Sequence, residues 1–331
     1  MGRKYRWGIL APGKMSAKFA AGLKILDNAD CYAVGSRSQE RAREFASAFG
    51  FRKAYGSYEE LASDRDVDVI YIASPHSHHM EHALLCLRNN KHVICEKAFA
   101  MNSAEVEAMI TEASSRGLFL MEALWPPFQP LYRKAIEIID SGMVGNLVHL
   151  NARFSFQPPF DRHDRKFDLS LGGSSLLDIG IYPVIDALTF MGIPDTIDAR
   201  ASFSSSGTED SISIIFSYSD GRMANLYSSY RTSGGIGCDL LCEKGNVSFS
   251  RKRDMSQNLL VSVHDKPVSD YSLVPDAMGY HFEAIEVMKC LDAGRTESSE
   301  VPLKFSRDLI STLDRIREVA GIRFDTDSFS V

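Results

Sequence analysis

The first third of the chain alternates between two patterns of hydrophobic positions. Short, nearly continuous apolar runs predict buried strands, and longer segments with apolar residues every three or four positions predict helices. Strands separated by helices form right-handed βαβ units. We therefore expect an α/β fold that begins with a doubly wound parallel sheet of the Rossmann type. The predicted strands cover 5–10, 31–35, 67–73, 92–96 and 118–123, and the predicted helices cover 15–26, 38–49, 78–89 and 103–116, with Ser38 and Ser103 as N-caps.

The pattern changes after Trp125, where short alternating runs replace the alternation of strand and helix. Turn-forming dipeptides such as Asp220-Gly221 separate these runs, as in antiparallel hairpins. We expect two domains, residues 1–123 and 124–331, of which the second is an α+β domain with a large, mainly antiparallel sheet. Its predicted strands cover 146–156, 197–203, 211–218, 223–230, 238–242 and 246–249, and its predicted helices cover 128–141, a segment starting near 177, 276–293 and 305–320.

Charge and composition exclude several classes of partner. The chain has 331 residues, of which 44% are hydrophobic, and 37 Lys and Arg against 43 Asp and Glu give a net charge of −6. A non-specific nucleic-acid site or an anionic membrane surface needs a cationic face, so neither partner is expected. No apolar run approaches the roughly 18–20 residues that span a bilayer, and the N-terminus lacks the pattern of a secretory signal. The scattered cysteines are typical of reduced thiols in a cytoplasmic protein.

A glycine-containing turn follows the first predicted strand. A dinucleotide pyrophosphate binds backbone N–H groups at a helix N-terminus, in a turn without bulky side chains. The usual G-x-G-x-x-G is reduced here to A-x-G-x-x-S. However, Gly13 follows the first predicted strand of a series of parallel βαβ units, and this position predicts a cofactor-binding turn. The alternative is a βα turn that binds no ligand. The turn consists of Ala11, Pro12, Gly13, Lys14, Met15 and Ser16.

The end of the second predicted strand indicates which dinucleotide binds. Folds that select NAD place Asp or Glu there, as an acceptor for the ribose 2′-hydroxyl. This chain has Ser36, Arg37 and Ser38 instead. A guanidinium between two hydroxyl groups suits a 2′-phosphate, and its plane can stack on adenine. We therefore predict NADP rather than NAD, with a solvated arginine at a helix start as the alternative.

Several motifs together resemble one family. They are Ser74-Pro75-His76-Ser77-His78-His79, Lys91-His92-Val93-Ile94-Cys95-Glu96-Lys97, and Gly172-Gly173 leading into Asp178-Ile179-Gly180-Ile181-Tyr182. In order and spacing they are similar to the glucose–fructose oxidoreductase/inositol dehydrogenase (Gfo/Idh/MocA) family across nearly the whole chain. Within the family the sequence resembles the dimeric dihydrodiol dehydrogenase branch most, because that branch has Tyr where many members have His after D-x-G-x.

The resemblance implies a two-domain oxidoreductase whose first domain binds NAD(P). It also implies an open-faced antiparallel sheet in the second domain, which commonly forms the interface of a homodimer or a higher homo-oligomer. Lys97 matches the lysine of the family's E-K-P motif, and Tyr182 matches the catalytic tyrosine of the branch. The resemblance assigns to the cofactor site Ser74, Pro75, His76, His79, Glu96 and Lys97, with His79 near the nicotinamide.

The sequence departs from the family pattern at three positions. Ala11 replaces the first fingerprint glycine, Ala98 replaces the proline after the motif lysine, and Pro127 interrupts a Trp-x-Arg-Phe pattern. The family proline often follows a cis peptide bond, and a cis bond to alanine costs about 2.5–4 kcal/mol. We therefore expect the local backbone at Ala98 to differ from that of the family.

Lys97, Asp178 and Tyr182 form the predicted catalytic set. Lys97 ends a predicted parallel strand, where open α/β sheets bind ligands, and the other two are four residues apart, which places them on one face of a helix. Hydride transfer from an alcohol requires a base for the hydroxyl proton, and a phenol with a pKa of about 10 is a weak base at neutral pH. An ammonium about 4 Å away supplies about 4 kcal/mol, which makes the phenol competent.

We therefore predict Tyr182 as the general acid/base and Lys97 as its electrostatic partner and substrate anchor. Asp178 would orient the substrate or Lys97. The alternative is a desolvated Lys97 that acts as the base itself.

Other polar and aromatic residues have two interpretations each. The histidines from His76 to His82 could hold a metal, but no carboxylate lies at ligand spacing, so we predict none. Trp125 and Phe128 either bind substrate in an apolar pocket or pack at the domain junction. We interpret four further residues as solvated charges, and the alternative is that they reach the site. They are Arg153, Arg162, His163 and Arg165.

These observations predict an NADP-dependent dehydrogenase or reductase that acts on a hydroxyl or carbonyl group of a sugar-like or vicinal-diol substrate. A redox-assisted glycosidase or epimerase, which recycles its nicotinamide in place, is a second hypothesis. A non-catalytic NADP sensor is a third. Release of NADPH with turnover distinguishes the first from the second, and binding without any hydride transfer indicates the third.

Overall fold

The computed structural model describes residues 3–252, 255–264 and 266–324. Internal contacts divide the chain into two compact units. The first unit comprises the residues up to 128 together with 276–307, and the second comprises 129–275 together with the residues from 308 onward.

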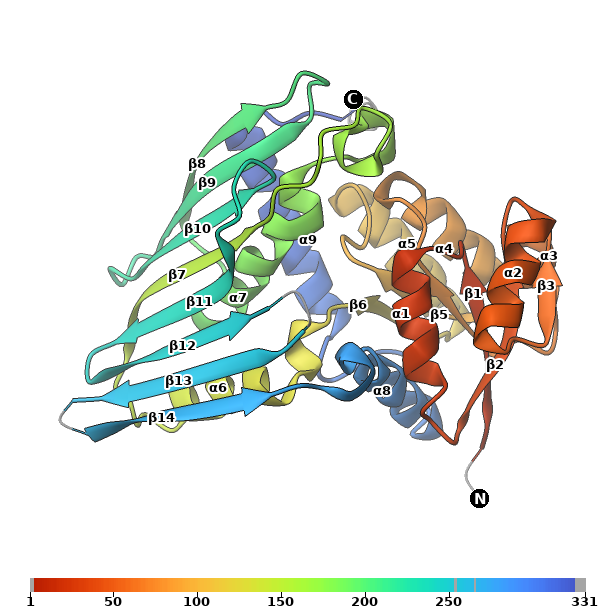
Figure 1. Cartoon of the computed structure of the whole chain (residues 1–331), viewed down its shortest axis with the longest axis horizontal. Coiled ribbons are helices and arrows are strands. Elements are labelled where there is room, and N and C mark those ends of the chain that lie inside the picture. Colours follow the sequence, from red (N-terminus) through yellow and green to blue (C-terminus); the bar gives the residue numbers. More distant parts are fainter. Residues whose placement is uncertain (1–2, 253–254, 265, 325–331) are drawn as a thin grey trace. The chain divides into compact units, whose positions relative to one another are not determined.

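The first unit contains a six-stranded sheet with the order β3-β2-β1-β4-β5-β6, in which all pairs are parallel (Figure 1). The order reverses between β1 and β4, and sheets of this kind bind ligands at their carboxyl edge near that point. The strands are β1 (Tyr5–Leu10), β2 (Ala29–Gly35), β3 (Lys53–Tyr55), β4 (Val69–Ile72), β5 (His92–Glu96) and β6 (Leu120–Ala123), and the helices are α1 (Lys14–Leu23), α2 (Gln39–Phe49), α3 (Tyr58–Ser63), α4 (His79–Arg88) and α5 (Ser103–Arg116).

The predicted elements of the first unit are present, with small shifts of their ends. β1 and β5 have the predicted bounds. The hydroxyl of Ser38 caps α2 by accepting the N–H of Arg41 at 3.3 Å. Ser103 is not the cap of α5, because the side chain of the preceding Asn102 accepts the N–H of Glu105. β3 and α3 were not predicted, because both are too short to show a periodic pattern.

Helix α8 (His281–Asp292) packs in the first unit, whereas the predicted boundary at 123/124 assigned it to the second domain. It contacts α1, where a methyl group on Gly22 would lie only 2.9 Å from the backbone nitrogen of His281. The hydroxyl of Tyr5 donates to Asp292 at 2.7 Å. The glycine lets the two backbones approach closely, and this partner is far from α8 in the sequence, so no local pattern indicates it.

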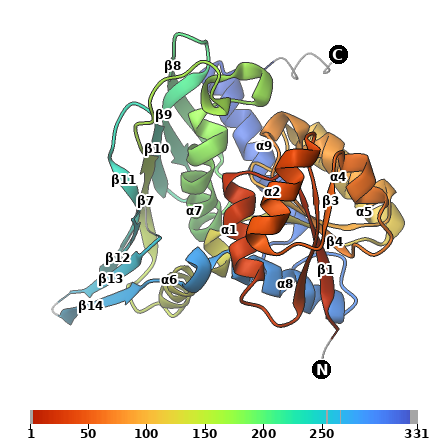
Figure 2. The same ribbon diagram turned by 45° about the vertical axis from the view of Figure 1, so that its right-hand side comes forward.

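An eight-stranded sheet forms most of the second unit, with the order β14-β13-β12-β11-β7-β10-β9-β8. Neighbouring strands are antiparallel except β7 and β10, which are parallel. In Figure 2 this sheet is seen close to edge-on, with α6 and α7 on the same face. The strands are β7 (Leu147–Ser155), β8 (Thr196–Phe203), β9 (Glu209–Ser217), β10 (Met223–Ser229), β11 (Gly235–Cys242), β12 (Gly245–Arg251), β13 (Gln257–Val263) and β14 (Lys266–Leu273), and the helices are α6 (Pro130–Asp140) and α7 (Ile181–Met191). Helix α9 (Leu303–Ala320) begins in the first unit and belongs to the second from Asp308 onward.

The predicted fold class is confirmed by these two sheets. The second sheet is larger than predicted, because the sequence analysis did not identify β13 and β14.

One described segment, Leu169–Met191, has the length and apolar composition of a membrane-spanning helix, contrary to the expectation that no run approaches that length. An 18-residue window of the segment has a mean hydropathy of 1.3, but 78% of that window is buried, and α7 packs on β7 and β10. The segment therefore belongs to the core of the second unit, and its enclosure by protein accounts for its apolar composition.

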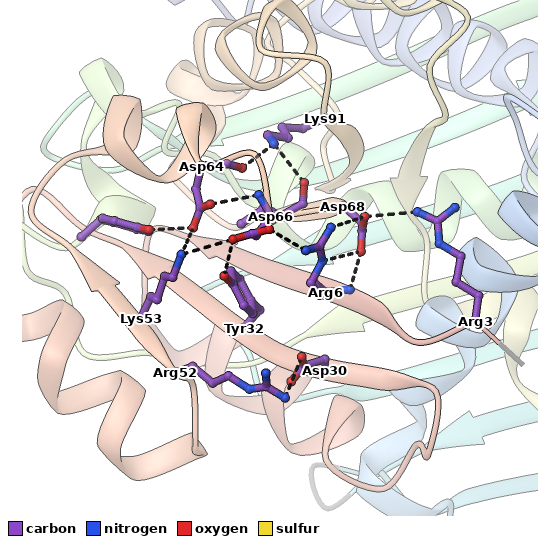
Figure 3. A network of polar contacts seen from close by, with 12 residues as sticks. Arg3, Arg6, Asp30, Tyr32, Arg52, Lys53, Asp64, Asp66, Asp68 and Lys91 are labelled. Carbon is purple, nitrogen blue, oxygen red and sulfur yellow. Dashed lines mark hydrogen bonds and ion pairs between the residues drawn. The ribbon is translucent and has the colours of Figure 1, made fainter. Parts of the chain in front are cut away.

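A network of charged side chains holds the amino ends of the strands in the first sheet (Figure 3). Asp68 precedes β4 and accepts the backbone N–H and the guanidinium of Arg6 in β1, at 2.8 and 3.2 Å. Lys91 precedes β5, and its buried ammonium donates to the carbonyls of Asp64 and Val67. These contacts lie at the edge opposite the carboxyl ends of the strands, so they stabilise the sheet away from the expected ligand edge.

Candidate functional site

The turn between β1 and α1 leaves the helix N-terminus uncovered. Gly13 is the N-cap, and a side chain placed on it would have no heavy atom within 4 Å. Among the described residues, no side chain caps this helix. The hydroxyl of Ser16 donates to the carbonyl of Ala11 at 2.8 Å, and Ala11 has a φ of 67°, the conformation that the usual glycine favours. The residues therefore fit the pyrophosphate of a dinucleotide, which would bind the N–H groups of the first turn.

Two arginines lie at the end of β2. Arg37 is exposed. It lies between Ser36, which is buried, and Ser38, and the N–H of Ser38 donates to the Ser36 hydroxyl at 3.2 Å. Arg41, one turn into α2, donates to the carbonyl of Pro12 at 3.3 Å. Its guanidinium thus links the β1–α1 turn to the start of α2. Arg41 was not among the predicted cofactor residues, although its spacing of four residues from Arg37 was an available signal.

His79 connects the carboxyl ends of β4 and β5. It is completely buried, and its ring nitrogens lie 2.8 Å from the carbonyl oxygens of Ser74 and Ala98. Both partners are acceptors, so a neutral imidazole, which carries one N–H, donates to one of them, and the ring lies between the two carbonyls beside Lys97. The cofactor contacts predicted for His79, Ser74 and the residues between them stay predictions. Within the described ranges, no three His, Cys, Asp or Glu side chains form a group that could hold a metal ion.

Lys97 follows β5 at the carboxyl edge of the first sheet and is half-buried. The Lys97–Ala98 peptide bond is cis, so the expectation that the backbone here departs from the family's cis geometry is wrong. Ala98 is completely buried, and its carbonyl oxygen is the one bound by His79.

Two carboxyl groups lie next to this turn in the interior of the first unit. The buried hydroxyl of Tyr71 donates to Glu96 at 2.5 Å. Glu122 accepts the backbone N–H of Phe99 at 3.0 Å, and burial raises its pKa to about 7. Glu96, predicted as a cofactor residue, therefore has a core tyrosine as a partner, and Glu122 is a buried acid that the sequence analysis did not identify.

Trp125 and Phe128 are buried, with exposed fractions of 3% and 4%. The indole N–H of Trp125 donates to the carbonyl of Met278 at 2.9 Å, which holds the turn before α8. Both side chains are therefore buried, and the substrate contacts predicted for them stay predictions.

Asp178 is the centre of a hydrogen-bonded group in the second unit. Its carboxylate accepts the guanidinium of Arg165 at 3.0 Å and the hydroxyl of Tyr230 at 2.7 Å. The charge of Asp178 raises the pKa of Arg165, and burial together with that charge raises the pKa of Tyr230 well above its usual value. The side chain of Arg165 is 44% exposed, so it is partly solvated as predicted, and its guanidinium also forms this ion pair with Asp178. The sequence analysis also missed Tyr230, which lies 52 residues from Asp178.

The backbone around Asp178 is shaped by close packing. Residues Leu176–Gly180 form a π-helix that precedes α7, so the four-residue spacing to Tyr182 does not place the two side chains as a regular α-helix would. A methyl group on Gly173 would lie 2.7 Å from the carbonyl oxygen of Arg165, so the preceding loop packs directly against the backbone of Gly173. The buried carboxylate of Glu209 accepts the N–H of Leu176 at 2.8 Å and anchors the start of the π-helix.

Tyr182 lies in the first turn of α7 and is half-buried. Its ring centre is 5.4 Å from that of Phe154, and the guanidinium of Arg251 lies 5.3 Å from the Tyr182 ring centre. Arg251 was not identified from the sequence. Tyr182 and Asp178 belong to the second unit and Lys97 to the first, and the convergence of the phenol and the ammonium stays a prediction.

Comparison with family models identifies both halves of the chain. The oxidoreductase family with an NAD-binding Rossmann fold (Gfo/Idh/MocA) matches residues 5–124, and the Gfo/Idh/MocA C-terminal domain matches residues 132–248. The chain belongs to the Gfo/Idh/MocA family. This family assignment confirms the resemblance found in the motifs.

Curated relatives include the trans-1,2-dihydrobenzene-1,2-diol dehydrogenases. The mouse protein (Mus musculus) is 35% identical over 341 residues, covering 97% of this chain and 98% of the relative. The human protein (Homo sapiens) is 34% identical with the same coverage. These relatives confirm the likeness to the dihydrodiol dehydrogenase branch. This Gfo/Idh/MocA protein is therefore an NAD(P)-dependent dehydrogenase or reductase that acts on CH–OH groups.

Solved structures with the same fold include other enzymes of this type. The 3-ketoreductase KijD10 from Actinomadura kijaniata, in complex with NADP and TDP-benzene, has a TM-score of 0.86 at 22% identity and covers 96% of this chain and 98% of that chain. Levoglucosan dehydrogenase, in complex with NADH and L-sorbose, has a TM-score of 0.85 at 18% identity and covers 97% of each chain. Their coverage confirms that the fold extends over both sheets.

Proposed function

We propose that this enzyme transfers a hydride between NADP and a hydroxyl or carbonyl group of a sugar-like or vicinal-diol substrate. The observation that carries the proposal is the pair Arg37 and Arg41 after the carboxyl end of β2, where Arg41 donates to Pro12 in the turn before the uncovered N-terminus of α1. The diol substrate is supported by the relatives named trans-1,2-dihydrobenzene-1,2-diol dehydrogenase, which match 97% of the chain.

Two groups of residues would hold the dinucleotide. The N–H groups that follow Gly13 would bind the pyrophosphate, because a helix N-terminus favours negative charge. Arg37, Arg41 and the hydroxyls of Ser36 and Ser38 would bind the 2′-phosphate through charge-assisted hydrogen bonds. When bound, the nicotinamide supplies or accepts the hydride.

Tyr182 is the proposed general acid/base. In oxidation its oxygen takes the proton of the substrate hydroxyl while the hydrogen on the same carbon leaves as hydride, and in reduction the proton returns to the carbonyl oxygen. The ammonium of Lys97 stabilises the phenolate, and the nearby guanidinium of Arg251 adds positive charge next to the ring. Asp178, held by Arg165 and Tyr230, accepts a hydrogen bond from the substrate and orients it.

The cofactor assignment is tested by Arg37→Gln and Arg41→Gln, with Arg43→Gln on α2 as the control. Each lost charge-assisted contact weakens NADP binding by about tenfold to a hundredfold and leaves NAD binding unchanged. Titration calorimetry with both dinucleotides measures the effect. Tighter binding of NAD than of NADP by the unaltered protein would contradict the assignment.

The chemical assignment is tested by absorbance of NADPH with a panel of diols, sugars and dicarbonyls. We expect Tyr182→Phe to abolish hydride transfer while NADP still binds. Loss of transfer in Lys97→Met but not in Tyr182→Phe would instead support Lys97 as the base. Product formation without release of NADPH would indicate the glycosidase or epimerase hypothesis, and binding without turnover would indicate the sensor.

We also propose that the protein is cytoplasmic. All of its cysteines are thiols, which suits a reducing compartment. Retention of activity without added oxidant or disulfide isomerase after cytoplasmic expression tests this point.

A further inference from the structure

A cavity of about 650 Å³ lies at one end of three adjacent strands in the second unit. It is formed where β7 and β10 finish and β9 begins, and these strands are neighbours in the sheet. Its volume is in the range of small-molecule sites. The residues that carry the argument are Gln157, Phe160, Phe167, Asp210, Tyr230 and Arg231.

Aromatic side chains form a large part of the cavity wall. The ring of Phe160 is 4.9 Å from that of Phe167, which in turn is 5.5 Å from the ring of Tyr230. Phe160 is 53% exposed and presents its ring to solvent, whereas Phe167 and Tyr230 are buried behind it. The apolar face of a sugar ring, or another flat ring, packs well against such surfaces.

The polar part of the wall carries one donor cation and one acceptor anion. Asp210 accepts the hydroxyl of Ser202 at 2.7 Å, and the same Ser202 oxygen accepts the guanidinium of Arg231 at 3.3 Å. Within the described part of the chain, Arg231 forms no ion pair, so most of its five N–H donors have no protein acceptor. Adjacent donors and acceptors next to aromatic rings match a ring with several hydroxyl groups, which both donates and accepts hydrogen bonds.

Tyr230 connects this cavity to the candidate catalytic residues. It lines the cavity, and its hydroxyl donates to Asp178 at 2.7 Å. A ring bound in the cavity would therefore lie one side chain away from the carboxylate that orients the reacting hydroxyl.

We propose that the cavity is a binding subsite for a second hydroxylated ring, stacked on Phe160 with its hydroxyls between Asp210 and Arg231. Its connection to catalysis rests on the function proposed above for Asp178. The ring comes from one of two sources: the distal unit of a two-ring substrate such as a disaccharide, or a free monosaccharide.

The test uses the NADP-loaded enzyme with cellobiose and glucose as probes. Saturation-transfer NMR measures binding, and NADPH absorbance measures kcat/KM. The variants are Arg231→Gln and Phe160→Ala, both at exposed positions, and the matched control is Arg162→Gln in the same loop region. Thermal unfolding confirms that each variant is folded.

We expect the unaltered enzyme to bind the sugar. Each cavity variant should weaken the affinity by about tenfold, and the control should leave it unchanged. If the second ring belongs to the substrate, kcat/KM for cellobiose falls about tenfold more than that for glucose. If a free monosaccharide is the source, glucose binding itself weakens in the variants. Absence of sugar binding below about 10 mM, or binding that the variants do not change, would overturn the subsite. A lack of turnover with bound sugar would instead count against the proposed function.

Discussion

Asp178 shows how the candidate site is assembled from single residues. Its carboxylate accepts hydrogen bonds from Arg165, which precedes it by 13 residues, and from Tyr230, which follows it by 52. Two donors fix the orientation of a carboxylate more firmly than one, because both oxygens are engaged. The residue identified by motif is thus positioned by two residues that no motif included.

We predict that Arg165→Gln lowers kcat/KM by about tenfold to a hundredfold, because the carboxylate of Asp178 loses its charged donor. Arg165→Lys restores part of the activity and also restores the pH profile, since it returns the positive charge. Steady-state kinetics across a range of pH measures both effects, with Arg162→Gln as the control. An unchanged profile in Arg165→Gln would show that the ion pair has no role in positioning.

The buried carboxyl group of Glu122 makes stability depend on pH. Burial raises its pKa from 4.5 to about 7, so its contribution to stability is complete below pH 4.5 and is lost as the pH rises through 7. Gln is neutral at every pH, so Glu122→Gln does not lose this stability. We predict that the free energy of unfolding of the variant, minus that of the unaltered protein, is about 3 kcal/mol higher at pH 8 than at pH 4.5.

Urea unfolding of Glu122→Gln at the two pH values measures this difference. Glu44→Gln, at an exposed position, is the control and should follow the unaltered protein. A variant with the same pH dependence as the unaltered protein would contradict the raised pKa.

Elements meet at glycines where their backbones approach most closely. The π-helix before α7 packs on β10, and a methyl group on Gly180 would lie 2.6 Å from the hydroxyl oxygen of Ser228. Periodicity predicted that a helix and a strand exist in these regions. It did not predict this contact or the π-helix, because both depend on residues that are about 50 positions apart in the sequence and meet only in the fold.

We predict that Gly180→Ala destabilises the protein by about 1–3 kcal/mol, because the added methyl group overpacks this contact. The double variant Gly180→Ala with Ser228→Ala recovers part of the loss, since it removes the hydroxyl oxygen that the methyl group meets. Chemical denaturation of the single and double variants measures the coupling. Equal stability of Gly180→Ala and the unaltered protein would show that the backbone shifts without cost.

At the scale of the whole molecule, the second sheet carries exposed apolar side chains. Ile215 on β9, Met223 on β10 and Leu260 on β13 are 39%, 40% and 41% exposed. They alternate with buried residues on the same strands, such as Ile214 and Leu259. An exposed sheet face of this kind supports the expected homo-oligomer.

We predict that the protein is a dimer in solution and that Ile215→Asp combined with Leu260→Asp makes it monomeric. A dimer of this variant would bury the two introduced carboxylates without a partner, which disfavours association. Light scattering coupled to size-exclusion chromatography measures the mass, and circular dichroism checks the fold. Val274→Asp, at a position 74% exposed just after β14, is the control. A monomeric unaltered protein would refute the prediction.

The sequence alone determined the parallel sheet, the helix-capping Ser38 and the turn around Gly13, because these features follow from periodicity and from residues adjacent in the chain. Its motifs also identified Lys97, Asp178 and Tyr182 as candidate catalytic residues, which stays a prediction. Only the tertiary structure decided that α8 packs on α1, that His79 bridges two strand ends, and that Asp178 binds Arg165 and Tyr230. The physical reason is that hydrogen bonding and close packing act between atoms near in space, and local patterns carry no record of which distant residues the fold brings together.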